Sequence, residues 1–264
     1  MEGSLVILIL FSVSLSFCWF FEKNGVWFQL NLLFLAWIIG VICDSVYRFR
    51  HFLGKVGKLI YIFFQGKTLR ISYAYLVRIK IRSKFFLIRG TRINQFQPVG
   101  GVYQFYDRTI LDRFHLSDDT ALREVPPDDL RLVFRTPKDI FRLCKFKRWF
   151  DSQRAREISP HREFYEEISQ LSFFDTAVFK NLKFEFKRRV DDGLLWSQHL
   201  GMYEHKIFDI FDLILNSEQE SLLERTLSES SESFKWVERG QIESLGYSRS
   251  GDEMRIGSHA KYLI

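Results

Sequence analysis

Three glutamates lie close together in one short segment of the chain. Glu163, Glu166 and Glu167 occupy positions i, i+3 and i+4, which puts their carboxylates on one side of a helix. Like charges at this spacing repel by about 0.2 to 0.5 kcal/mol per pair, and a shared cation offsets that cost. Because oxygen ligands suit Mg²⁺ and Mn²⁺, the segment is a candidate site for either ion. The alternative is a solvated helix face that Arg154 and Arg162 neutralise.

The residues around these glutamates carry the signals of a helix that begins near position 160. Ser159 can cap such a helix, and Pro160 suits its first position. Phe164, Ile168 and Leu171 recur at i, i+4 and i+7, which is the spacing of a buried stripe. We therefore expect an amphipathic helix whose carboxylates lie beside its buried face.

Segments rich in β-branched and aromatic residues lie on both sides of this helix and predict strands. Residues 108–152 interrupt them and are expected to be an insertion. Strands before and after one internal helix, with another helix near the end, predict a mixed α/β sandwich rather than an alternating parallel sheet. The predicted strands lie within residues 69–81, 85–88, 95–106, 130–134, 182–186 and 206–215.

Residues 162–167, with the sequence Arg-Glu-Phe-Tyr-Glu-Glu, resemble the core of the Nudix box. Gly101, followed after five residues by Asp107, resembles the glycine and the acidic residue that open the box. The two pieces are far apart here, so the resemblance implies a box divided by an insertion. It also implies a Nudix-like α/β/α sandwich in which the three glutamates hold Mg²⁺ or Mn²⁺ and Arg162 orients them.

The box also departs from the family pattern. Asp107 is shorter than the expected glutamate, Ser169 stands where the family has glycine, and Gln170 replaces an aliphatic residue. Hydrolysis needs a metal ion held by several carboxylates and a water molecule aimed at phosphorus. We therefore expect ligand binding to survive in this domain and turnover to be lost.

Two apolar runs without charged residues precede this domain, at residues 5–21 and 26–43. Their lengths predict a two-helix transmembrane hairpin at residues 1–45, then a basic and aromatic juxtamembrane linker at 46–66 and the Nudix-like domain at 67–264. Basic residues after the second run predict that both termini are cytoplasmic. A cleaved signal peptide is the alternative, but no basic residue precedes the first run.

The hairpin and the divided box together resemble the SMODS-associating Nudix-like proteins, which have two N-terminal transmembrane helices. This resemblance implies an effector of CBASS, a bacterial antiphage system in which a synthase makes a cyclic oligonucleotide. The Nudix-like domain would bind that signal, and the hairpins would form homo-oligomers that disrupt the inner-membrane bilayer. A membrane-tethered Mg-dependent Nudix hydrolase of a nucleotide diphosphate-type substrate is the second interpretation. A membrane-anchored structural partner without a ligand is the third.

A nucleotide ligand needs cations for its phosphates and aromatic faces for its bases. Arg89 and Arg92, near the Gly-Gly bend, and Trp196 are the candidate ligand-binding residues. The net charge of +6 also fits nucleic acid, but the basic segment follows an apolar run, so we expect lipid contact and no direct DNA binding. The chain has 3 cysteines, without the spacing of a disulfide framework or a metal site.

Overall fold

The computed structural model describes residues 25–90, 93–119, 128–171, 173, 175–229, 231–247 and 254–264. The chain divides into two units, Met1–Ile60 and Tyr61–Ile264, and each is considered by itself. The first apolar run, residues 5–21, lies outside the described residues.

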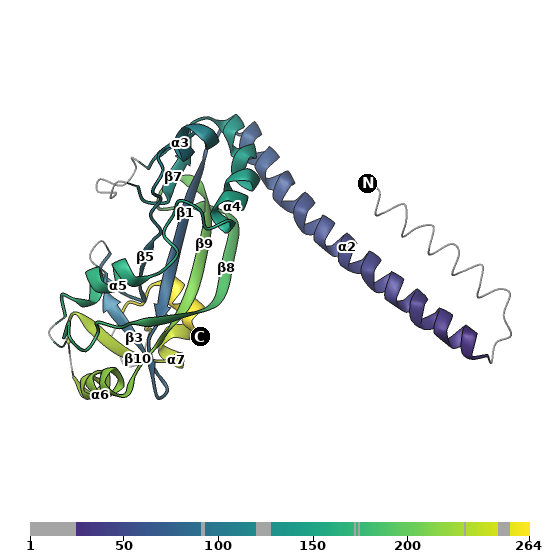
Figure 1. The fold of residues 1–264 in the computed structure, drawn as a ribbon. Helices are drawn as coiled ribbons and strands as arrows, with labels where there is room; N and C mark the ends of the chain where they lie inside the picture. Colours follow the sequence, from purple (N-terminus) through teal and green to yellow (C-terminus); the bar gives the residue numbers. More distant parts are fainter. Residues whose placement is uncertain are drawn as a thin grey trace. The chain divides into compact units, whose positions relative to one another are not determined.

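The second apolar run belongs to a 39-residue helix, α2 (Val26–Phe64), which does not end at Cys43 (Figure 1). The helix continues through Asp44 and Arg50 and includes most of the predicted linker. Gln29 also interrupts its apolar part, and a polar side chain is costly to place in hydrocarbon. Within the part of the chain that the structure describes, no helix is long and apolar enough to cross a membrane. The predicted transmembrane hairpin and its two-span location in the bacterial inner membrane are therefore wrong on this finding.

The larger of two sheets in the second unit has six strands in the order β6-β7-β1-β9-β8, with β5 also paired to β1. Strand β1 is parallel to β9 but antiparallel to β5 and β7, so this sheet contains both strand directions. Its strands are β1 (Leu69–Arg78), β5 (Val99–Val102), β6 (Leu116–Asp118), β7 (Arg131–Phe134), β8 (Lys183–Ser197) and β9 (Met202–Ile214).

The smaller sheet has four strands in the order β10-β3-β2, with β4 paired to β3. These strands are β2 (Lys80–Ile81), β3 (Lys84–Arg89), β4 (Phe96–Gln97) and β10 (Phe234–Glu238). Because successive side chains of a strand point to opposite faces, β3 contributes to two separate cores. Phe86 and Ile88 face one core, and Phe85 and Leu87 face the other.

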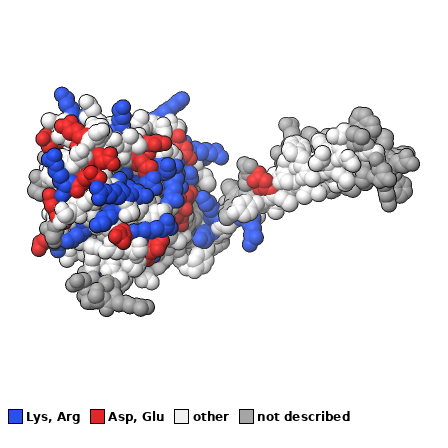
Figure 2. Space-filling model, turned by 90° about the horizontal axis from the view of Figure 1, so that it is seen from below, with Lys and Arg blue, Asp and Glu red and all other residues white. Residues whose placement is uncertain are grey.

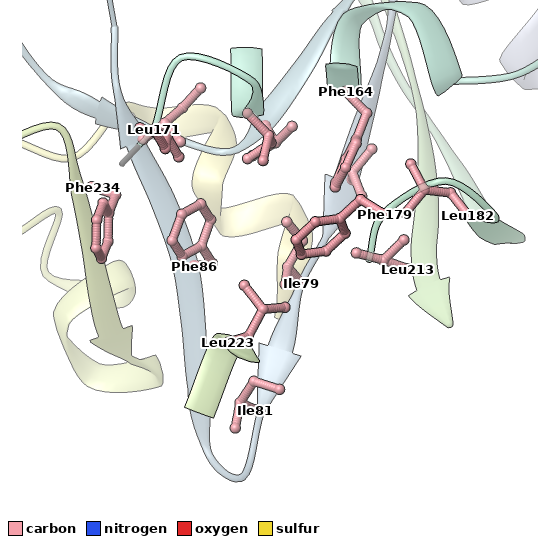
Figure 3. Packing of buried hydrophobic residues seen from close by; sticks show 14 residues of the cluster. Ile79, Ile81, Phe86, Phe164, Leu171, Phe179, Leu182, Leu213, Leu223 and Phe234 are labelled. Atoms are coloured by element: carbon pink, nitrogen blue, oxygen red, sulfur yellow. The ribbon is translucent and has the colours of Figure 1, made fainter. Parts of the chain in front are cut away.

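Helices cover both of these cores. The core around Phe86 is closed by α5 through Phe164 and by α6 through Leu223 (Figure 3). The other core contains Ile242 of α7 and Leu263 of η3. The helical segments are α3 (Thr109–Phe114), η1 (Pro137–Arg142), α4 (Leu143–Asp151), α5 (His161–Ile168), α6 (Ser217–Arg225), η2 (Thr226–Ser228), α7 (Arg239–Glu243) and η3 (Ser258–Leu263).

Helix α5 begins one residue later than the sequence pattern predicts. Pro160 is its N-cap residue and makes no side-chain cap bond, and Ser159 bonds the ring of His161 instead of capping the helix. The predicted stripe of Phe164, Ile168 and Leu171 is buried as expected.

The predicted insertion becomes part of the main sheet. Strand β7 pairs with β1 from Arg70 to Ser72, and β6 then forms the edge of the sheet. Helix α4 packs Phe146 and Phe150 against Tyr73 of β1. The segment therefore extends the sandwich.

Charged side chains of both signs share the surface. On the face shown in Figure 2, Lys and Arg side chains gather across the middle, with Asp and Glu among them. On this face, therefore, the two signs of charge are intermingled.

Candidate functional site

The Gly-Gly bend and the glutamate helix lie directly against each other. Strand β5 holds Gly100 and Gly101 opposite Leu76 and Tyr75 of β1. The side chain of Glu163 covers Gly101 so closely that an added Cβ would lie 2.5 Å from Glu163 Oε1, with the Glu163 carboxyl carbon closer still. A larger residue at 101 would therefore displace the Glu163 side chain, because α5 packs its first glutamate on the bare backbone.

Gly101→Ala is expected to lower the free energy of unfolding by about 1 to 3 kcal/mol, because the new methyl group overlaps the Glu163 side chain. Combining it with Glu163→Ala removes the overlapping atoms, so the double variant should lose less stability than the two single changes predict together. Gly240→Ala is the control, since a Cβ there meets nothing within 4 Å. Urea unfolding of the four variants measures the effect, and strict additivity would contradict the contact.

Arg162 is the centre of the charge network on α5. Its Nη1 donates to Glu163 Oε1 at 2.8 Å and to Glu166 Oε2 at 3.1 Å. Its Nη2 donates to the backbone oxygen of Val102 and to Glu157 Oε2, each at 3.1 Å. One guanidinium group thus bridges three carboxylates and strand β5. Burial raises the pKa of Glu163, and the bond from Arg162 opposes that rise.

Glu157, which sequence reasoning missed, takes the place expected of Asp107. It is buried, and besides Arg162 it accepts from the backbone N–H of Gln104 at 3.3 Å. Asp107 lies at the start of α3, where its exposed carboxylate accepts from the backbone N–H of Thr109 and its pKa is lowered by those bonds. The structure does not bring Asp107 to α5, because α3 and α5 lie in different parts of the unit (Figure 1).

Glu167 is the most perturbed carboxyl of the three. Burial raises its pKa to about 8, the backbone N–H of Gly100 lowers it, and the charges of Glu163 and Glu166 raise it further. The Gly100 N–H donates to Glu167 Oε2 at 2.8 Å. Near neutral pH this carboxyl therefore keeps a large protonated fraction.

The Nudix resemblance implies a resident Mg²⁺ or Mn²⁺ ion. The arrangement of these residues does not fit one. Glu163 and Glu166 already share the charge of Arg162, and Glu167 accepts a hydrogen bond from the backbone N–H of Gly100. Within the described ranges the buried Arg162 Nε has no acceptor, so this unsatisfied N–H group needs a hydrogen-bond acceptor and not a cation. Among the described residues, no group of three or more His, Cys, Asp or Glu could hold a metal ion.

A cavity of about 460 Å³ opens beside these carboxylates. Its lining joins the three glutamates of α5 to Arg89, Gly90 and Ser233 at the ends of β3 and β10. The structure thus brings Arg89, a predicted ligand residue, next to the predicted glutamates. Arg92 lies outside the described residues.

Trp196, the third predicted ligand residue, lies near the end of β8. Its ring packs edge-on against Tyr203 with centroids 4.9 Å apart, and Lys67 Nζ lies 3.8 Å from the ring centroid. In the described part of the chain it does not line the cavity beside α5. Trp196 is 42% exposed, so it lies on the surface of the larger sheet and not beside the glutamates.

Comparison with known proteins agrees with this architecture. No curated protein and no solved structure matches the chain. The model of one family, described as the SMODS-associated NUDIX domain, matches residues 68–264, which include both sheets, the Gly-Gly bend and α5. The chain therefore belongs to the SMODS-associated NUDIX domain family.

Proposed function

We propose that this domain is the ligand-binding part of a defence-associated protein and that it binds a nucleotide of the cyclic oligonucleotide class without hydrolysing it. The observation that carries the proposal is the bridge from Arg162 to Glu157, Glu163 and Glu166. A hydrolytic Nudix site needs these carboxylates available to a metal ion, whereas here all three are bonded to Arg162.

The cavity beside α5 supports binding of a small molecule. Its volume of about 460 Å³ is within the range of sites for such ligands. Arg89 supplies a cation at its rim, and the neutral form of Glu167 reduces repulsion of a phosphate group. Membership of a family named for its association with SMODS supports a cyclic oligonucleotide as the ligand. We further propose that ligand binding promotes association of several copies of the chain.

Isothermal titration calorimetry of the full chain with cyclic di- and trinucleotides tests the proposal. We expect saturable binding of at least one member, with no change in the nucleotide after incubation with Mg²⁺ or Mn²⁺. The mass of the protein, measured by light scattering with and without that nucleotide, tests association. Binding of no member would remove the proposal. Product release that stops in Glu166→Gln combined with Glu167→Gln would show instead that the site is a hydrolase.

A further inference from the structure

A second cavity, of about 350 Å³, lies at the end of the smaller sheet and is lined by three cations. They are Arg89 of β3, Lys235 of β10 and Arg255, which directly precedes the bridge between Ile256 and Phe96. Among the residues that the structure describes, Glu232 is the one acidic residue of this lining, and its side chain is 96% exposed. The described lining therefore carries an excess of positive charge.

This cavity opens on the opposite face of the sheet from the glutamate helix. Lys235 pairs with Leu87, whose side chain belongs to the core that α7 covers. Phe96 packs against that same core, whereas Ile88, which lines the cavity beside α5, belongs to the other core. Arg89, at the end of β3, borders both cavities.

The described part of the chain neutralises the cations of this site poorly. Arg89 Nε donates to Asn94 Oδ1 at 3.0 Å, and its Nη1 lies 3.6 Å from the exposed Glu232 carboxylate, a pair that solvent weakens. Across the described residues, the side chains of Lys235 and Arg255 form no hydrogen bond or ion pair. Because Arg89 and Lys235 are diagonal neighbours on one sheet face, their repulsion favours an anion between them.

The remaining lining suits the base of a nucleotide. The ring of Phe96 is half-buried, and among the residues that the structure describes it contacts no other aromatic ring. Such a ring can stack on a base, and the amide of Asn94 can bond a base edge. The backbone holds this wall in place, because Phe96 N donates to Arg255 O at 2.7 Å and Gly257 N donates to Phe96 O at 2.8 Å.

We propose that this cavity is a nucleotide subsite, in which Arg89, Lys235 and Arg255 bind phosphate and Phe96 stacks on a base. The inference rests on the proposed function and adds to the cavity beside α5 a second binding position, on the face opposite the glutamates. Because Arg89 borders both cavities, a bound phosphate that draws it from Glu232 also changes the cationic rim of the cavity beside α5.

The test uses the full chain, and its probes are cyclic di- and trinucleotides together with inorganic tripolyphosphate. Lys235→Glu combined with Arg255→Glu should weaken nucleotide and tripolyphosphate binding at least tenfold, since each charge-assisted bond to phosphate is lost. Phe96→Leu should weaken nucleotide binding several-fold and leave tripolyphosphate binding unchanged. The matched control is Lys138→Glu combined with Lys145→Glu, two exposed lysines in the insertion, which makes the same change in net charge.

The results separate this inference from the proposed function. If the unmutated chain binds a nucleotide and the double variant, folded by circular dichroism, binds it equally well, the subsite is overturned and the proposed function stands. If tripolyphosphate binding falls but Phe96→Leu has no effect on the nucleotide, the stacking role is overturned. If the unmutated chain binds no nucleotide, both are overturned.

Discussion

Arg162→Met is expected to lower the free energy of unfolding by about 3 to 5 kcal/mol, the cost of removing one partner from a largely buried ion pair. The side chain of Arg162 is 24% exposed, and those of its partners Glu157 and Glu163 are 9% and 18% exposed. Without the guanidinium group these carboxylates face each other with little water to screen them. Urea unfolding at pH 7, followed by circular dichroism, measures the loss.

A second change distinguishes the charge network from simple packing. Glu157→Gln in the Arg162→Met background removes one of the unpaired carboxylates, so part of the lost stability should return. Arg239→Met is the matched control, because Arg239 pairs with Glu243 on an exposed helix face and such pairs contribute only about 0.3 to 0.5 kcal/mol. If Arg162→Met and Arg239→Met lower the free energy of unfolding equally, the Arg162 bridge stabilises the fold no more than an exposed ion pair does.

The main parts of the site follow from local sequence patterns. Phe164, Ile168 and Leu171 have helical spacing, and all three are buried where that spacing predicts. The spacing of Glu163 and Glu166 likewise places both within reach of one cation. Helix periodicity is a short-range property, so a single sequence is enough to predict it.

The partner of the arginine could not be found in the same way. The family pattern has an acidic residue between the Gly-Gly bend and the helix. If the insertion follows that residue, the candidate is Asp107; if the insertion precedes it, the candidate is Glu157. The chain passes through α3, β6, β7 and α4 before it reaches Glu157, only five positions before Arg162. The available signal was an acidic residue just ahead of the helix, but pairing it with the backbone N–H of Gln104 requires the tertiary fold.

The cationic cavity had still less local signal. Arg89, Lys235 and Arg255 are widely separated in the sequence, and only the pairing of β3 with β10 and the bridge between Phe96 and Ile256 bring them together. The apolar run at residues 26–43 presents the opposite difficulty. Its composition favours a membrane span, but α2 continues beyond it into charged residues, and composition alone does not show where a helix ends.

Glu167 gives the domain a pH dependence of stability opposite to that of an ion-paired carboxylate. Its pKa is raised from 4.5 to about 8, chiefly by burial. Between these two values the folded chain holds a proton that the unfolded chain has lost, so rising pH favours unfolding. The contribution is fully present below about pH 4.5 and is lost as the pH rises through about 8.

Glu167→Gln should remove this dependence. Glutamine keeps an acceptor for the Gly100 N–H but cannot ionise. The free energy of unfolding of the variant, relative to that of the unmutated chain, should therefore rise by about 2 to 4 kcal/mol from pH 5 to pH 8. Urea unfolding of both chains at the two pH values measures the difference. Glu166→Gln, which removes the neighbouring exposed carboxylate, controls for a change in helix charge.

An unmutated chain that is no less stable at pH 8 than Glu167→Gln would show that Glu167 is ionised in the folded state. That result would also reopen the metal interpretation, because an ionised Glu167 beside Glu163 adds negative charge that Arg162 does not neutralise. The expected result instead means that, at neutral pH, Glu167 is largely protonated in the folded chain. A pocket with that charge state accepts a phosphate group more readily than one with three ionised glutamates, since one source of repulsion toward the anion is removed.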